Sequence, residues 1–251
     1  MFEQIARVRA HELVVQQLQE RIMRGDLRAG DHLPAERELV AGFGISRATL
    51  REGLRVAESM GLIQTLGGGA RAIVTAQPAR GVARIVGALI NNDVSTLAEL
   101  VEVRVVLEGT AAFLAAGRSP QELQEVVGAY DDMRVADSFD SFVEADVRFH
   151  LATAEAARNA MLALITAALR EPVADAIRVP LRRGGGERAR ELTLGRHGRV
   201  LEAMLAGNQW RARALSVRAL YDNFSPVLEP DTQVRLESLV AAYEDGDARR
   251  A

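Results

Sequence analysis

The feature that most constrains this chain is a short stretch between residues 62 and 74, because it interrupts a sequence of otherwise helical character. Two strand-favouring runs flank three consecutive glycines, Gly67, Gly68 and Gly69. Such a pattern predicts a β-hairpin with a glycine-rich tip. Elsewhere Leu, Val and Ala dominate and only 4% of the residues are aromatic, so we expect a mainly α-helical protein.

The length of the chain indicates two domains that meet just after this hairpin. With 251 residues, the chain exceeds the ~150 residues that are typical of one domain. Pro78 disfavours a helical conformation at the residue before it, so residues 75–78 suit a linker. We therefore predict one domain over residues 1–76 and a second over residues 77–251.

The charge balance differs between the two predicted domains. The chain has 31 Lys+Arg, all of them arginine, and 34 Asp+Glu, so its formal net charge is −3. Residues 1–76 hold ten arginines and nine acidic residues, so the first domain is nearly neutral within an acidic chain. Its arginines can still gather on one face, and the overall charge does not exclude a nucleic-acid partner.

The lack of cysteine excludes several kinds of chemistry at once. Disulfides, thiolate zinc sites, iron–sulfur clusters and cysteine nucleophiles all need that residue. Its absence also fits a reducing cytoplasm. The longest apolar run, residues 160–169, has about half of the ~20 residues that a membrane-spanning helix needs, and the N-terminus lacks the pattern of a signal peptide. We therefore expect a soluble cytoplasmic protein with no membrane partner.

Three helices are predicted ahead of the hairpin. The apolar spacing indicates helices over residues 8–24, 35–42 and 47–60, and Ser46 is a suitable N-cap for the third. The order helix, helix, tight turn, helix, hairpin is that of a winged helix-turn-helix. The third helix buries a stripe of Leu50, Leu54 and Ala57, and its outward polar residues are Arg47, Thr49, Arg51 and Arg55.

These outward residues suit the recognition of DNA. A helix fits the major groove, where arginine pairs bidentately with guanine and threonine can bond to a base or pack on a thymine methyl. A glycine-rich tip lets the backbone approach the phosphates or enter the minor groove. The alternative interpretation is that the arginines only solvate an exposed helix face. The order of the elements and the Ser46 cap favour DNA binding.

Two motifs in this region resemble those of the GntR family of bacterial transcription regulators. They are LPAEREL at residues 33–39 and ISRATLRE at residues 45–52, within a similarity that runs from about residue 11 to residue 74. Gly53 stands where the family pattern usually has alanine, which costs about 1 kcal/mol in helix preference. The resemblance implies DNA binding by Arg37, Ser46, Arg47, Thr49 and Arg51, with the tip glycines Gly67, Gly68 and Gly69 at the minor groove.

Helical periodicity continues from residue 80 onward and predicts an all-α bundle of six or seven helices. Asp146 and His150 are four residues apart, so they lie on one helical face. His197 is in phase with the apolar residues of a later helix and also points inward. One carboxylate and two imidazoles can bind a divalent metal such as zinc, manganese or nickel. Alternatively, each histidine is a partly buried core residue with a hydrogen-bond partner.

The second half of the chain resembles the FCD effector domain, which defines the FadR-like branch of the GntR family. The similarity spans about residues 80–225 and rests on VEVR at residues 101–104, on Leu107 and Glu108, and on Asp146, Phe149, His150, Asn159 and His197. It implies a helical ligand pocket, commonly metal-bearing, that binds small carboxylates.

Three metal positions of that domain are matched by Asp146, His150 and His197, and a fourth is not. The fourth ligand is usually a histidine, and here Leu220 occupies its place. Either three ligands suffice or the pocket holds its effector without an ion. Arg104 is a candidate for binding an effector carboxylate through a bidentate fork. The alternative for Arg104 is an i,i+4 ion pair with Glu108 on the helix surface.

The sequence thus predicts a ligand-controlled transcription factor rather than an enzyme. We expect a homodimeric repressor that reads a palindromic DNA operator and is released by a small, carboxylate-bearing metabolite. One alternative function is a metal-dependent hydrolase that uses Asp146, His150 and His197. Another is a purely structural helical adaptor, which would bind no specific DNA.

Overall fold

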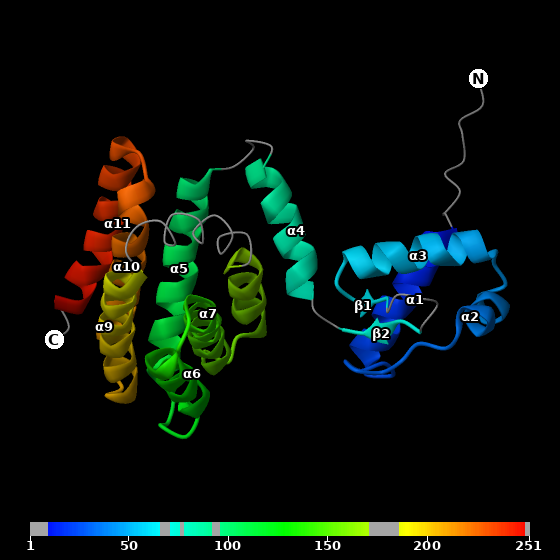
Figure 1. Cartoon of the computed structure of the whole chain (residues 1–251), viewed down its shortest axis with the longest axis horizontal. Coiled ribbons are helices and arrows are strands. Elements are labelled where there is room, and N and C mark those ends of the chain that lie inside the picture. The colour runs from blue at the N-terminus through cyan, green and yellow to red at the C-terminus, as the bar shows by residue number, and fades with distance from the viewer. Residues whose placement is uncertain (1–9, 66–70, 76–77, 92–95, 171–185, 249–251) are drawn as a thin grey trace. The chain divides into compact units, whose positions relative to one another are not determined.

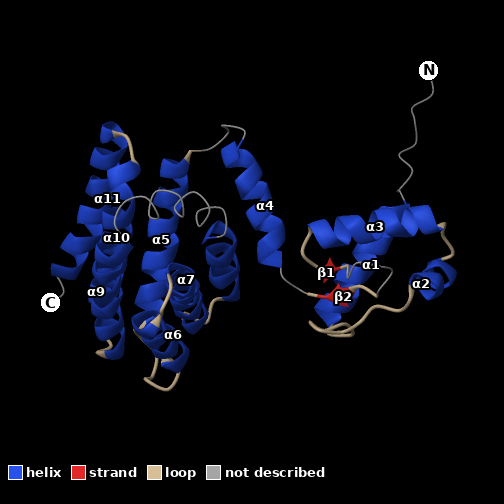
Figure 2. Cartoon of the chain, viewed as in Figure 1, coloured by secondary structure: helices blue, strands red, loops and turns tan. Residues whose placement is uncertain are grey.

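The computed structural model describes residues 10–65, 71–75, 78–91, 96–170 and 186–248. These residues form two compact units, which divide between Val82 and Ala83. Helices dominate both units, and the sheet found among the described residues has two strands (Figure 2). The predicted fold class, mainly α with an N-terminal winged helix-turn-helix and a helical C-terminal bundle, is confirmed.

The first unit has the predicted order of elements. Three helices, α1 (Ala10–Arg24), α2 (Glu36–Phe43) and α3 (Arg47–Ser59), precede the strands β1 (Ile63–Gln64) and β2 (Ile73–Val74). The strands pair antiparallel, with Ile63 opposite Val74. The glycines of the predicted tip, Gly67, Gly68 and Gly69, lie outside the described residues. The core of this unit consists of Val14, Val15, Leu18, Leu33, Leu50, Leu54, Ala57, Ile63, Ala72 and Val74.

The helix boundaries of this unit have local causes. Gly44 adopts a left-handed conformation with φ of 65°, which ends α2, and Ser46 then caps α3. Helix α2 begins one residue later than predicted, because Ala35 is extended and donates its N–H to Glu38 Oε2 at 3.1 Å. Pro34 therefore lies two residues before the first residue of α2.

Gly53 is explained by the packing of α3 on α1. It is buried, and a Cβ at this position would lie 3.0 Å from both the carbonyl oxygen of His11 and the Cβ of Val14. The glycine gives up helix preference, but it lets the two helices approach closely. The place where the sequence departs from the family pattern is therefore a helix–helix contact.

The second unit is a helical bundle with α5 near its centre (Figure 1). Helix α5 packs on α10 and on α7, while α9 packs on α10 and α6 packs on α7. Residues 160–170 are also helical. The labelled helices are α4 (Pro78–Asn91), α5 (Leu97–Ala115), α6 (Gln124–Val135), α7 (Phe139–Ala156), α9 (Gly186–Leu205), α10 (Gln209–Phe224) and α11 (Pro230–Ala248).

Two capping motifs occur in this unit. Thr96 and Glu99 form a reciprocal cap of α5, with Thr96 N–H donating to Glu99 Oε2 at 2.8 Å. Ser119 and Glu122 also bond to each other, but residues 120–123 form a turn and α6 begins only at Gln124. The second motif therefore caps a turn. Within the described residues, no helix combines the length and apolar character needed to cross a bilayer.

Candidate functional site

The predicted DNA-contacting residues of α3 cluster at its N-terminal end. Ser46 Oγ accepts the N–H of Thr49 at 3.1 Å, and the two hydroxyl oxygens are 2.8 Å apart. Thr49 is therefore held by the cap and is half-buried. The side chains of Arg37, Arg47, Arg51 and Arg55 are exposed. Of these four, Arg47 and Arg51 lie near the capped end of α3, where unpaired backbone N–H groups favour an anion.

Arg51 is engaged in a contact that sequence reasoning did not predict. Its Nε lies 3.2 and 3.1 Å from the two carboxylate oxygens of Glu36, and its Nη2 lies 3.1 Å from Oε2. The pair links α3 to α2. The Arg51 side chain is still 60% exposed and that of Glu36 45% exposed, so the pair is weak and a phosphate can compete for the guanidinium.

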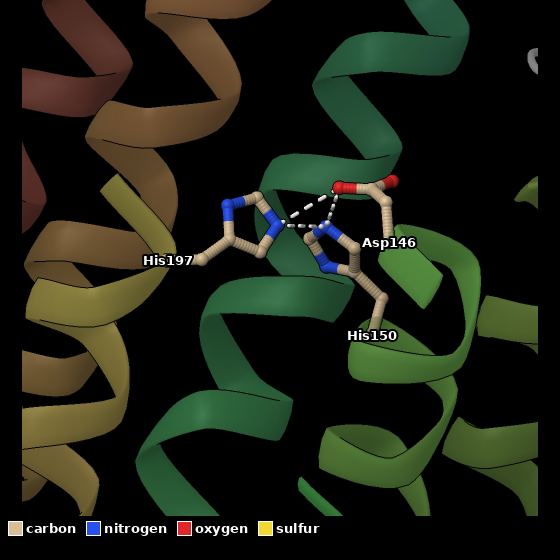
Figure 3. A group of neighbouring side chains, drawn as sticks. All are labelled: Asp146, His150 and His197. Carbon is tan, nitrogen blue, oxygen red and sulfur yellow. Dashed lines mark hydrogen bonds and ion pairs between the residues drawn. The ribbon is translucent and has the colours of Figure 1, made fainter. Parts of the chain in front are cut away.

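In the second unit, three potential metal ligands converge. Figure 3 shows Asp146 and His150 projecting from α7 toward His197 on α9. The two Nε2 atoms are 2.9 Å apart, and Asp146 Oδ1 lies 3.0 Å from His197 Nε2 and 3.7 Å from His150 Nε2. The structure therefore brings together the three residues that the sequence singled out, two from α7 and one from α9.

The opposite nitrogen of each imidazole has its own acceptor. His197 Nδ1 lies 2.9 Å from the carbonyl oxygen of Thr193, one turn earlier on α9. His150 Nδ1 lies 3.0 Å from Glu108 Oε2, on α5. A carbonyl or carboxylate oxygen only accepts, so these contacts assign the proton of each neutral ring to Nδ1. Both Nε2 lone pairs then face Asp146.

This arrangement fits a bound divalent cation. Three acceptor atoms at such short separations repel one another unless a positive charge lies between them. Nitrogen and oxygen ligands bond such ions at ~2.0–2.2 Å, so neighbouring ligands at right angles lie ~3 Å apart. Two of the three distances, 2.9 and 3.0 Å, match that value, and the third, between His150 Nε2 and Asp146 Oδ1, is longer at 3.7 Å. The same two distances also match the alternative interpretation, in which one imidazole is protonated on both nitrogens and its Nε2–H donates a hydrogen bond to Asp146 or to the other histidine.

The charges around the three donors are buried and balanced. Glu108 and Arg170 are 5% and 8% exposed. Arg170 Nη2 bonds Asp146 Oδ2 at 2.8 Å, and its Nη1 lies 3.3 Å from Glu108 Oε1. Burial opposes ionisation of Glu108, but Arg104, His150 and Arg170 hold the pKa of its carboxyl well below its usual range. Burial also opposes ionisation of Asp146, whose pKa is nevertheless held well below its usual range by the two histidines.

Arg104 forms the ion pair with Glu108 that was the alternative to effector binding. Its Nε and Nη2 both lie 2.7 Å from Glu108 Oε1, and its guanidinium lies 5.1 Å from the centre of the Phe224 ring. The pair differs from the expected surface contact because Arg104 is only 4% exposed. It lies next to the three donors, since Glu108 also contacts His150.

Arg170 was not predicted as part of the site. The sequence feature that could have indicated it is its position directly after the longest apolar run, since a charged residue there lies at the end of a buried helix. Its Nε is buried and has no hydrogen-bond partner among the described residues. Arg170 thus presents an unused donor beside Asp146.

Leu220, predicted at the place of a fourth ligand, is an apolar core residue of α10. It is 4% exposed and belongs to the same cluster as Val105 and Val217. Asp222, two residues after Leu220, contacts Arg196 with an Nε–Oδ2 distance of 3.4 Å. Within the part of the chain that the structure describes, the metal-ligand group thus has three members.

Comparisons with protein families match both units. The model of bacterial regulatory proteins of the gntR family matches residues 10–73, and the FCD domain model matches residues 99–222. The chain is 32% identical over 158 residues to the Glc operon transcriptional activator of Escherichia coli K12, with 60% of this chain and 62% of that protein covered.

Two further comparisons agree with these matches. The chain is 30% identical over 171 residues to the HTH-type transcriptional repressor NanR of Cronobacter sakazakii, with 66% of this chain and 65% of the relative covered. The chain thus spans just under two thirds of these curated relatives. The solved structure of Streptococcus agalactiae GntR has the same fold, with a TM-score of 0.64 at 20% identity, and covers 86% of this chain and 99% of that chain.

Proposed function

Because this chain belongs to the GntR family of bacterial regulatory proteins and carries an FCD domain, we propose that it is a ligand-responsive transcription regulator. The domain of residues 1–76 binds operator DNA, and the domain of residues 77–251 binds the effector and forms a homodimer in the cytoplasm. One observation carries this proposal. A winged helix-turn-helix unit and a helical unit with three converging metal-ligand side chains occur in one chain.

In this proposal, α3 enters the major groove of the operator with its N-terminal end. Arg47 and Arg51 pair with guanine or phosphate, while Thr49 contacts a base edge. Arg37 and Ser46 contact the DNA from the start of α2 and the cap of α3. The tip glycines Gly67, Gly68 and Gly69 approach the minor groove. A symmetric dimer would place two such helices on the half-sites of a palindrome.

Asp146, His150 and His197 hold a divalent metal, such as zinc, manganese or nickel, in the effector domain. The bound ion would supply positive charge and open coordination positions for a ligand oxygen. Arg104 and Arg170 already balance Glu108 and Asp146, so a divalent ion makes the buried site cationic. A small carboxylate therefore suits the site, with Arg104 and the unused Nε–H of Arg170 as additional contacts.

The effector releases the protein from DNA by favouring one of two dimer geometries. A ligand that binds both geometries equally shifts no equilibrium, so it must contact residues whose positions differ between them. We propose a repressor, which is the role named for NanR, whereas the Glc operon relative is named an activator. The family and these relatives are transcription regulators, and the comparisons do not support a hydrolase that uses the three metal-ligand residues.

Selection of bound sequences from random double-stranded DNA tests the DNA-binding half of this proposal. We expect the full chain to enrich a palindromic sequence, and the enriched DNA to lose affinity steeply as salt rises. Failure to enrich any sequence would support the structural adaptor instead.

Elemental analysis of the purified protein tests the effector half. We expect one divalent metal per chain in the wild type and none in the double variant His150→Ala, His197→Ala. Negligible metal in both proteins, after incubation with zinc, manganese and nickel in turn, would contradict the metal site. It would mean that the three side chains only form hydrogen bonds with one another.

A further inference from the structure

We propose that Glu108 is the positioning residue of the metal centre. It holds the His150 imidazole in the tautomer and orientation that present Nε2 to His197 and Asp146. This inference rests on the proposed metal site, and it concerns a side chain that donates no ligand atom itself. It assigns to α5 a part in a site whose three ligands come from α7 and α9.

The two histidines are oriented by different means. His197 Nδ1 donates to the backbone carbonyl of Thr193, four residues earlier on its own helix, so the formation of α9 is enough to orient it. His150 has its Nδ1 acceptor on another helix, where Glu108 Oε2 lies 3.0 Å away. The orientation of His150 therefore depends on one side chain. A ligating imidazole usually has such a partner on its second nitrogen, and loss of that partner weakens metal binding.

Glu108 is itself fixed in place by two arginines. Its Oε1 lies 2.7 Å from both Nε and Nη2 of Arg104 and 3.3 Å from Nη1 of Arg170. These contacts engage mainly Oε1 and leave Oε2 directed at His150. A carboxylate between two guanidinium groups is ionised and can only accept, so the His150 nitrogen facing it must be the protonated one.

A glutamine at position 108 would reverse this arrangement. The two arginines only donate, so they would keep the amide oxygen of the new side chain on their side. The amide NH₂ would then face His150 Nδ1, which must accept, and the ring proton would move to Nε2. A protonated Nε2 has no lone pair for a metal. Glu108→Gln thus changes the tautomer of His150 while nearly preserving the shape of the side chain.

The experiment measures zinc affinity by titration against a competing chelator, with metal-free full-length protein. We expect Glu108→Gln to weaken zinc binding by about 10–100-fold. Glu237→Gln is the matched control, because Glu237 pairs with Arg218 at 2.8 Å but contacts none of the three ligands. The control should bind zinc like the wild type. Circular dichroism checks that each variant is folded.

A second readout reports the tautomer directly. Nitrogen-15 NMR of the metal-free protein at neutral pH should find the His150 proton on Nδ1 in the wild type and on Nε2 in Glu108→Gln. A loss of packing alone would not exchange the two nitrogens. Wild-type His150 protonated on Nε2 would overturn the inference even if Glu108→Gln did not fold.

The remaining outcomes separate this inference from the proposed function. Equal zinc affinity in the wild type and in Glu108→Gln would overturn the role of Glu108 and leave the metal site standing. A wild type that binds no zinc, manganese or nickel would overturn both. Equal weakening in Glu108→Gln and Glu237→Gln would show a general effect of losing an arginine partner, and it would also overturn the role of Glu108.

Discussion

Arg51 pairs with Glu36 of its own chain, and in the proposed complex its guanidinium would bind DNA instead. Its ion pair with Glu36 connects α2 with α3, and both side chains remain largely exposed. Such exposed pairs contribute about 0–1 kcal/mol, whereas a specific arginine–guanine contact contributes about 1–3 kcal/mol. The guanidinium can therefore leave Glu36 for a base or a phosphate. In the proposed complex, binding of DNA would therefore break the pair that links Arg51 to α2.

Replacing the arginines of α3 should weaken operator binding. We expect Arg47→Ala or Arg51→Ala to cost about 1–3 kcal/mol where the residue contacts a base, because a bidentate hydrogen-bonding pair is lost. Fluorescence anisotropy with the selected operator measures this change. Arg134→Ala is a suitable control, because Arg134 is an exposed residue of α6 that pairs with Asp131. Wild-type affinity in both α3 variants would rule out α3 as the recognition helix.

Glu108 should also make the stability of the metal-free protein depend on acid. Its pKa is lower in the folded chain than the ordinary value of 4.5, so it contributes stability above that value. This contribution is lost as the pH falls through the depressed folded pKa, because the proton then binds more readily to the unfolded chain. We expect the free energy of unfolding to decrease below about pH 4.5.

Denaturant titrations between pH 3 and pH 7 measure this dependence. Trp210 is the one tryptophan of the chain and lies in α10, so its fluorescence reports on the C-terminal unit. The decrease should be smaller in Glu108→Gln, which has no carboxyl to titrate at this position. An identical slope in both proteins would mean that Glu108 does not carry the effect.

Among the elements, α11 extends the effector domain beyond the matched FCD region, which ends at residue 222. Its Leu236 and Val240 are fully buried in the cluster that contains Leu220. Two ion pairs also link α11 to its neighbours. Glu237 pairs with Arg218 of α10, and Arg235 pairs with Glu102 of α5. The apolar packing should contribute more than these exposed pairs, since burial removes hydrocarbon from water and exposed charges are screened.

Truncating Leu236 tests how much α11 stabilises the unit. Leu236 is 0% exposed, so Leu236→Ala leaves a cavity and should cost about 2–5 kcal/mol of unfolding free energy. Val234→Ala on the same helix is the control, because Val234 is 69% exposed and should change stability by less than about 0.5 kcal/mol. Urea unfolding followed by Trp210 fluorescence measures both. Equal stability of the two variants would mean that α11 is not packed as described.

The proposed DNA and effector sites lie in two separate compact units, each of which has its own core. In the proposed dimer, communication between the two sites requires that the effector bind two states with different affinity, and this coupling is reciprocal. Operator DNA must then weaken effector binding by the same factor by which effector weakens DNA binding.

The double variant His150→Ala, His197→Ala should separate operator binding from the response to the effector. We expect it to keep the operator affinity of the effector-free wild type, because the first unit retains its core and its α3 face. It should lose the release of DNA by effector, because the metal-ligand group is gone. Anisotropy titrations of operator, with and without an effector found by screening carboxylates, measure both properties. A variant that still responds fully would place the effector elsewhere.

Features that depend on neighbours along the chain could be predicted from the amino-acid sequence alone. A helix brings residues four apart onto one face, so Asp146 and His150 belong together before any packing is known. A cap acts within one turn, which is why the start of α3 after Ser46 agrees with the prediction. Motif spacing likewise sufficed for the winged helix-turn-helix and for its family.

Contacts between helices could not be predicted in this way and became known from the three-dimensional packing. Glu108, His150 and Arg170 are separated by tens of residues, and their contacts depend on how α5 and α7 pack rather than on any spacing in the chain. The same holds for Arg51 and Glu36, and for Gly53 against Val14. Helical periodicity shows which way a side chain faces along its own axis. The partner that it meets is set by the rotation and separation of the neighbouring helices, which many weak contacts determine together.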